Sequence, residues 1–173
     1  NAAFMRPNVF TNTPDILSNY LQTGTPSAFA IRATLAATLS PTYGVYSGYE
    51  LYEHARLRPD SEEYLDTEKF QLRPRDWNLG EEQGRSLAPY LTLLNEIRRN
   101  NPALQELRTL RFHPSDSPDI IAFSKRGGEN GEDVILVVCN TDPHNDHSTT
   151  IHWNLPELGV SRGDQFAVTD LIS

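Results

Sequence analysis

The spacing of the apolar residues changes near Pro102, and this change limits the folds that the 173-residue chain can adopt. Before that point the apolar residues recur with the period of helices, most clearly from Leu87 to Ile97. After it they form short strand-like runs that are separated by turn residues. These runs cover residues 107–113, 120–125, 134–140, 149–153 and 165–170. We therefore expect an α/β part over residues 1–101, followed over residues 102–173 by an all-β part that belongs to an antiparallel β-sandwich.

The first part predicts the order strand, helix, strand, helix. Thr25 is a favoured N-cap and Pro26 a favoured first helical residue, so a helix should run from Pro26 to Leu39. This helix has almost no polar stripe, and most of its circumference must therefore be covered by other parts of the protein. A short strand is expected over residues 43–48. Ser86 should cap a second, amphipathic helix with Arg98 and Arg99 near its C-terminal end, and Asn101-Pro102 should end it.

Residues 56–84 lie between these elements and show neither a helical nor a strand period. They are rich in Arg, Glu, Asp and Pro, which is typical of a long loop with room for one helical turn. Loops of this length in compact domains are usually functional or disordered. The aromatic residues Tyr64, Phe70 and Trp77 favour an ordered loop that packs against the rest of the protein.

The turn Asn12-Thr13-Pro14-Asp15 follows a strand-like run that begins near Phe4. A turn between a parallel strand and a helix lies at the carboxyl edge of the sheet, where barrel enzymes place catalytic groups. Asp15 is therefore a candidate catalytic carboxylate. The alternative is that Asp15 is the N-cap of a helix beginning at Ile16, because aspartate is a favoured residue at that position.

The composition argues against some functions. The net charge is −8 and the pI is about 5.0, which disfavours general binding to nucleic acids or anionic membranes. No apolar run approaches the roughly 20 residues that a membrane-spanning helix needs. The lone Cys139 lies in an apolar run and is expected to be a small core residue, which fits a reducing, cytoplasmic setting.

A metal site is the first alternative function. His144 and His147 lie near Asp142 and Asp146, but Pro143 and the surrounding turn residues favour a solvated loop over a metal site. We expect neither a metal nor a cofactor. Ser/His/Asp hydrolysis is also disfavoured, because the chain has no Gly-x-Ser-x-Gly motif.

A carbohydrate-binding or interaction module is the second alternative. Trp153, in the fourth predicted strand of the second part, could present an aromatic surface to a glucan if its ring is exposed. The other interpretation of Trp153 is a core residue of the sandwich, which we expect to be the case.

Three stretches resemble one enzyme family. They are residues 6–15, which contain Arg6-Pro7-Asn8 and the turn that ends at Asp15; residues 35–51, LAATLSPTYGVYSGYEL; and residues 61–77, SEEYLDTEKFQLRPRDW. Together they resemble the bacterial α-1,4-glucan:maltose-1-phosphate maltosyltransferases of the α-amylase superfamily. The resemblance runs from about Phe4 to about Lys125 and continues more weakly beyond it.

The resemblance implies a fold and an activity. It implies the C-terminal strand–helix units of a (β/α)8 TIM barrel followed by part of a β-sandwich domain. It also implies a retaining enzyme that transfers maltosyl units from maltose 1-phosphate to the non-reducing ends of α-1,4-glucans. Neither the nucleophile nor the acid/base of the family is matched, so we expect a fragment that is inactive alone. A fragment of an α-amylase-type glycoside hydrolase is the alternative within the superfamily.

The resemblance also assigns roles to three residues. Asp15 would be the third carboxylate, which binds hydroxyls of the reacting sugar and favours the positively charged transition state. Asn12 would shape the same pocket, and Lys69 would bind the distal glucose of the maltosyl unit. Without the resemblance, Lys69 would be interpreted as a surface charge paired with Asp66 or Glu68.

An incomplete barrel would leave parallel strand edges without partners, and such edges pair with other chains. We therefore expect a homodimer.

Overall fold

The computed structural model describes residues 4–23, 25–69 and 71–172. Among these residues, no helix is both long and apolar enough to cross a membrane. The elements, in chain order, are β1 (Asn8–Phe10), α1 (Asn19–Gln22), α2 (Pro26–Leu39), β2 (Thr42–Gly44), a 3-10 helix η1 (Tyr49–Leu51), α3 (Trp77–Glu82), α4 (Ala88–Asn100), a 3-10 helix η2 (Pro102–Gln105), β3 (Arg111–His113), β4 (Ile120–Gly127), β5 (Asp133–Asn140) and α5 (Leu155–Leu158).

The strands β1 and β2 pair in parallel, with Asn8 opposite Thr42 and Phe10 opposite Gly44. The crossover between them contains α1 and α2, as a parallel pair requires. Gly44 has no room for a side chain, because a Cβ atom there would overlap the ring of Phe10. The predicted strand–helix–strand order of the first part is therefore confirmed.

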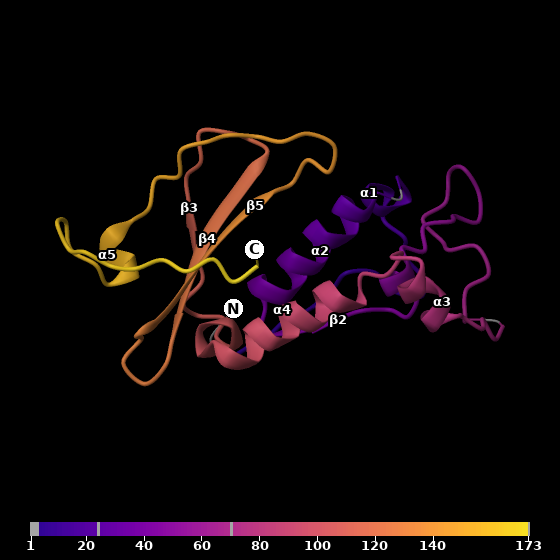
Figure 1. The fold of residues 1–173 in the computed structure, drawn as a ribbon, viewed down its shortest axis with the longest axis horizontal. Coiled ribbons are helices and arrows are strands. Elements are labelled where there is room, and N and C mark those ends of the chain that lie inside the picture. The colour runs from indigo at the N-terminus through magenta and orange to yellow at the C-terminus, as the bar shows by residue number, and fades with distance from the viewer. Residues whose placement is uncertain (1–3, 24, 70, 173) are drawn as a thin grey trace.

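The helix α2 has the predicted bounds and is covered on several sides. Its N-cap is Thr25, whose hydroxyl accepts a hydrogen bond from the Ala28 N–H at 3.3 Å. One side of α2 packs on α4 and another on β5, so the helix lies between α4 and the three-stranded sheet (Figure 1). This position explains why its sequence has almost no polar stripe.

Two buried or half-buried cations hold the C-terminal end of α2. Arg98 of α4 donates to the carbonyls of Ala37, Ser40 and Pro41, the last at 2.7 Å. Lys125 of β4 is fully buried, and its ammonium donates at 3.2 Å to the carbonyls of Thr38 and Leu104. Carbonyls at a helix C-terminus have no partner within the helix, and these two residues supply one.

The second part contains one antiparallel sheet in the order β3–β4–β5. Phe112 pairs with Phe123, and Phe123 with Val137, so β4 is the central strand. Phe123 is completely buried, whereas Phe112 on the edge strand is 63% exposed. The strands predicted over residues 120–125 and 134–140 are confirmed, each slightly longer than expected.

The other predicted strands of the second part are wholly or partly wrong. Residues 107–113 form a strand only from Arg111 to His113. Residues 149–153 contribute one isolated bridge, between Ser115 and Ile151, and residues 165–170 form no strand. Their alternating pattern favours a strand, but a strand requires a neighbouring strand for its backbone hydrogen bonds.

Two details of the first part also differ from expectation. The N-cap of α4 is Leu87 rather than Ser86, although the Ser86 hydroxyl accepts from the Ala88 N–H at 3.2 Å. In the long loop Tyr64 is buried, as expected of an anchor, but Trp77 is 40% exposed at the start of α3. Phe70 lies outside the described residues.

Burial of Lys125 should make stability depend on pH. Burial lowers the Lys125 pKa from 10.5 to about 8. Between these values the unfolded chain binds a proton that the folded chain does not, so the free energy of unfolding should rise with pH. The expected increase from pH 7 to pH 9 is about 1 kcal/mol. Urea unfolding at both pH values measures it.

The control is Lys125→Met, which fills the same space without a titrating group. This variant should lose the increase, whatever its absolute stability. An increase of equal size in both proteins would contradict the assignment to Lys125.

Candidate functional site

The turn after β1 carries Asp15 at the carboxyl end of the strand. The carboxylate does not cap a helix at Ile16, because α1 begins only at Asn19, with Ser18 as its N-cap. The Leu17 N–H, which a cap at Asp15 would bind, donates to the Glu62 carbonyl instead. The N-cap interpretation of Asp15 is therefore wrong. The side chain of Asp15 is 60% exposed, and its Oδ1 lies 2.8 Å from the Nζ of Lys69.

The structure thus brings two of the predicted site residues into contact. Lys69 comes from the long loop, and its side chain is 43% exposed. The hydrogen bond and the charge of Asp15 raise the pKa of Lys69. A carboxylate that accepts and an ammonium that donates, side by side at the surface, can together bind hydroxyl groups of a sugar.

Asn12, the third predicted residue, is 4% exposed and bonds protein groups. Its Oδ1 accepts from the Tyr46 N–H and the Thr11 hydroxyl, both at 2.9 Å. Its Nδ2 donates to the Tyr64 hydroxyl at 2.8 Å and to the Tyr46 carbonyl at 3.4 Å. Asn12 therefore fastens the end of β1 to the segment after β2 and to the long loop.

The long loop is held by a network of charges that the sequence did not reveal. Arg75, whose side chain is 5% exposed, makes a two-point contact with Glu53 at 2.9 and 3.1 Å. Its third contact is Glu68, at 2.9 Å, the residue before Lys69. Arg73 also lies 3.3 Å from Glu53. Glu53 and Arg75 are far apart in the sequence, and the only hint of their pairing was an aperiodic loop rich in both charges.

Gly48 leaves room for this network. Its φ is +97°, a conformation that favours glycine, and a Cβ atom there would overlap the Glu53 carboxylate. A side chain at position 48 would therefore displace the carboxylate that holds Arg75.

His147, in the segment after β5, pairs with Asp142. His147 Nε2 lies 2.9 Å from Asp142, which raises the pKa of His147 and lowers that of Asp142. In the part of the chain that the structure describes, no group of three or more His, Cys, Asp or Glu side chains is arranged to hold a metal ion.

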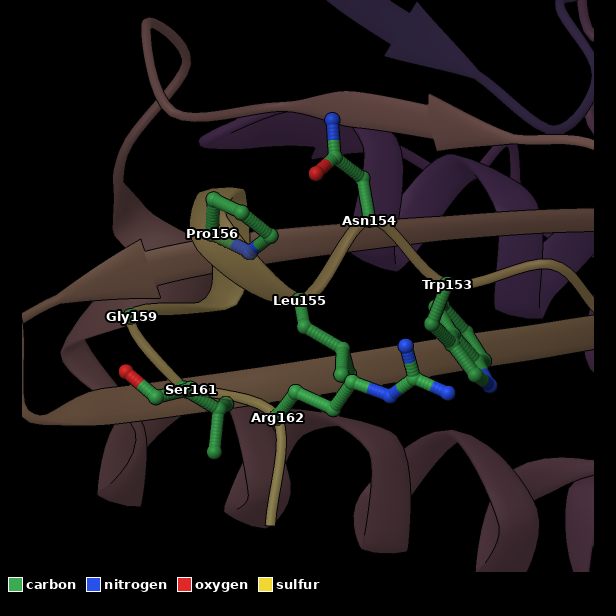
Figure 2. Close-up of a pocket in the computed structure, with 8 residues that line it drawn as sticks. Trp153, Asn154, Leu155, Pro156, Gly159, Ser161 and Arg162 are labelled. Atoms are coloured by element: carbon green, nitrogen blue, oxygen red, sulfur yellow. The ribbon is translucent and has the colours of Figure 1, made fainter. Parts of the chain in front are cut away.

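Trp153 is neither a fully exposed platform nor a core residue. It is half-buried, and its ring packs on His113 with the ring centroids 4.8 Å apart. Trp153 borders a pocket of about 580 Å³. The side chain of Arg162, which also lines this pocket, extends toward Trp153 (Figure 2). The other residues that line the pocket are Asn154, Leu155, Pro156, Gly159, Val160 and Ser161.

Comparison with known proteins gives one consistent result. The profile of a family described as "GLGE, C-terminal" matches residues 112–173. Alpha-1,4-glucan:maltose-1-phosphate maltosyltransferase 2 of Streptomyces coelicolor is 56% identical over 169 residues, which are 98% of this chain and 25% of that enzyme. The maltosyltransferase of Corynebacterium glutamicum is 54% identical over 172 residues, 99% of this chain and 25% of the enzyme. That of Mycobacterium tuberculosis is 49% identical over 172 residues, 99% and 24% of the two chains. The chain thus spans about a quarter of the length of these relatives.

The different burial of Asn12 and Asp15 predicts a large loss of stability for one variant and almost none for the other. Asn12→Ala removes four hydrogen bonds and leaves buried partners such as the Tyr64 hydroxyl unpaired, so it should cost roughly 2–4 kcal/mol of unfolding free energy. Asp15→Asn alters an exposed ion pair and should leave the unfolding midpoint nearly unchanged. Chemical unfolding of both variants measures this. A large loss with Asp15→Asn would mean that Asp15 has a structural role.

Proposed function

The chain belongs to the α-1,4-glucan:maltose-1-phosphate maltosyltransferase family over nearly its whole length, and we propose that it provides such an enzyme with the donor-binding end of its active site. The proposed reaction is the transfer of a maltosyl unit from maltose 1-phosphate to the non-reducing end of an α-1,4-glucan. The names of the relatives support transfer rather than the hydrolysis catalysed by α-amylase-type glycoside hydrolases.

In this proposal Asp15 is the third carboxylate of a retaining active site. The nucleophile and the acid/base are other carboxyl groups of the complete enzyme, and Asp15 acts beside them. It accepts hydrogen bonds from hydroxyls of the reacting ring. Its negative charge favours the oxocarbenium-like transition state over the ground state, so it contributes to the chemical step.

Lys69 and Asn12 bind and shape the site. The Lys69 ammonium donates to hydroxyls of the distal glucose, one ring away from the reacting centre. Asn12 fixes the loop and strand ends around the pocket through its bonds to Tyr46 and Tyr64. The single observation that carries the proposal is the 2.8 Å contact between Asp15 and Lys69. It brings the turn after β1 and the long loop together, with both side chains exposed to a ligand.

The architecture we propose for the complete enzyme follows from the two sheets. The parallel pair β1–β2, with its helical crossover, supports the C-terminal strand–helix units of a (β/α)8 TIM barrel over residues 1–101. The antiparallel sheet β3–β4–β5 supports part of a β-sandwich domain over residues 102–173.

A homodimer and a reducing, cytoplasmic location complete the proposal. Among the described residues β1 and β2 pair only with each other, which supports further pairing at their outer edges. The apolar sequence of α2 does not imply a second surface for self-association, because α4 and β5 cover this helix within the chain. The thiol of Cys139 is buried, which raises its pKa to about 11 and fits an unreactive cysteine.

Carbohydrate binding at Trp153 is a second candidate function. The half-buried ring and the polar groups of Asn154, Ser161 and Arg162 border the same pocket, a combination that suits a neutral sugar. Of the two functions, the relatives support the maltosyltransferase.

Asp15→Asn tests the main proposal in a hybrid enzyme in which this chain replaces the matching quarter of the Streptomyces coelicolor relative. Asparagine keeps the size of the side chain but removes its charge. We expect kcat for maltosyl transfer from maltose 1-phosphate to fall by about 10²–10³-fold. Turnover with a maltooligosaccharide acceptor measures the effect.

The matched control is Asp60→Asn, which changes an exposed carboxylate of the same loop region that lies 4.0 Å from Arg58. It should leave kcat unchanged. A folded Asp15→Asn enzyme with the kcat of the unsubstituted hybrid would refute the catalytic role.

The second candidate predicts a fluorescence response. Titration of the chain with maltoheptaose should change its tryptophan emission in a saturable way if the sugar binds beside Trp153. The response should persist in Trp77→Phe and disappear in Trp153→Phe. Emission that does not change with maltoheptaose in the unsubstituted chain excludes this candidate.

A further inference from the structure

We propose that Arg75, together with Glu53 and Glu68, forms a clamp that positions Lys69 for donor binding. Arg75, Glu53 and Glu68 are then positioning residues, because they act on substrate only through Lys69. The inference rests on the proposed function of Lys69 and extends it to a group of residues with no assigned role.

The clamp is a buried charge cluster next to an exposed functional residue. The side chains of Arg75 and Glu53 are 5% and 14% exposed, and Glu68, at 33%, leads toward the surface. Burying such charges costs free energy that apolar residues of similar volume would not cost. Apolar contacts would be enough to hold the loop against the protein. The use of charged groups instead favours a role in fixing the positions of particular side chains.

The clamp holds the backbone immediately before Lys69. The Glu68 carboxylate accepts from Arg75 at 2.9 Å, and the Glu68 N–H donates to the Tyr46 hydroxyl at 3.2 Å. The Arg75 guanidinium also holds the pKa of Glu68 below its ordinary value. With both its side chain and its N–H engaged, Glu68 fixes where the Lys69 side chain begins.

The same clamp is linked to the turn that carries Asp15. The Tyr46 hydroxyl bonds Glu68, while the Tyr46 backbone bonds the side chain of Asn12, three residues before Asp15. Tyr46 therefore contacts both the segment that carries Lys69 and the turn that carries Asp15. Anchoring the backbone beside Lys69 reduces the backbone entropy that the loop loses when the lysine binds a ligand.

Glu68→Ala is the test variant, because it removes the link to Lys69 while Arg75 keeps Glu53 as its partner. Its control is Glu68→Gln, which removes the charge but keeps an oxygen that accepts from Arg75. The first measurement is the Lys69 pKa, followed by NMR in the 173-residue chain. Asp15→Asn shows the value that Lys69 takes without its partner.

We expect the Lys69 pKa to be raised in the unsubstituted chain and in Glu68→Gln. In Glu68→Ala it should fall to the value found in Asp15→Asn. A Lys69 pKa that stays raised in a folded Glu68→Ala chain overturns the clamp. This measurement requires no catalytic activity, so its outcome is independent of the proposed function.

The second measurement is the KM for maltose 1-phosphate in the hybrid enzyme. Glu68→Ala should raise KM by about 3- to 10-fold with kcat within about two-fold, and Glu68→Gln should resemble the unsubstituted hybrid. The double variant Glu68→Ala/Lys69→Ala should be no worse than Lys69→Ala alone, because the clamp acts only through the lysine. Additive losses would mean that Glu68 acts elsewhere, and would overturn the proposal even where Asp15→Asn behaves as expected.

Discussion

The fold depends on the hydrogen bonds that the backbone carbonyls at the C-terminal end of α2 accept from other elements. The carbonyls of Ala37 and Thr38, in its last turn, accept hydrogen bonds from Arg98 of α4 and Lys125 of β4. These two cations come from either side of the change in apolar spacing, so their bonds join the helical part to the antiparallel sheet. The Ser40 hydroxyl, just beyond α2, donates to the Pro7 carbonyl at 2.6 Å and brings the start of β1 to the same place. One helix end therefore aligns β1, α4 and β4.

The candidate site lies at the opposite end of β1 from these contacts. Parallel pairing with β2 sets the direction of the strand, and the Thr11 N–H extends the pairing by donating to the Gly44 carbonyl at 3.0 Å. Asn12 then fixes the turn to Tyr46 and Tyr64, which leaves Asp15 exposed at the tip. Rigid, buried contacts thus place a polar pair at the surface, an arrangement suited to a ligand rich in hydroxyl groups.

The sequence predicted those elements whose signals are local. The cap at Thr25, the apolar helix α2 and the strands β4 and β5 agree with the structure, because helix caps and apolar periods act between near neighbours. Residues 165–170 have a strand pattern, but pairing depends on a partner that the pattern does not specify. The role of Arg75 was missed for the same reason, since its contact with Glu53 forms only once the loop has folded. Apolar periodicity did not predict the contact of Asp15 with Lys69 either, although the turn after the first strand indicated Asp15 and the family resemblance indicated both residues.

The central claim is that Asp15 and Lys69 contact two successive rings of a maltosyl unit. A crystal structure of the hybrid enzyme with a bound maltosyl donor or donor analogue tests it most directly. We expect an Asp15 carboxylate oxygen within about 2.6–3.2 Å of a hydroxyl on the reacting ring, and the Lys69 ammonium at a similar distance from a hydroxyl of the distal ring. A maltosyl unit bound elsewhere, with Asp15 and Lys69 bonded only to each other, would contradict it.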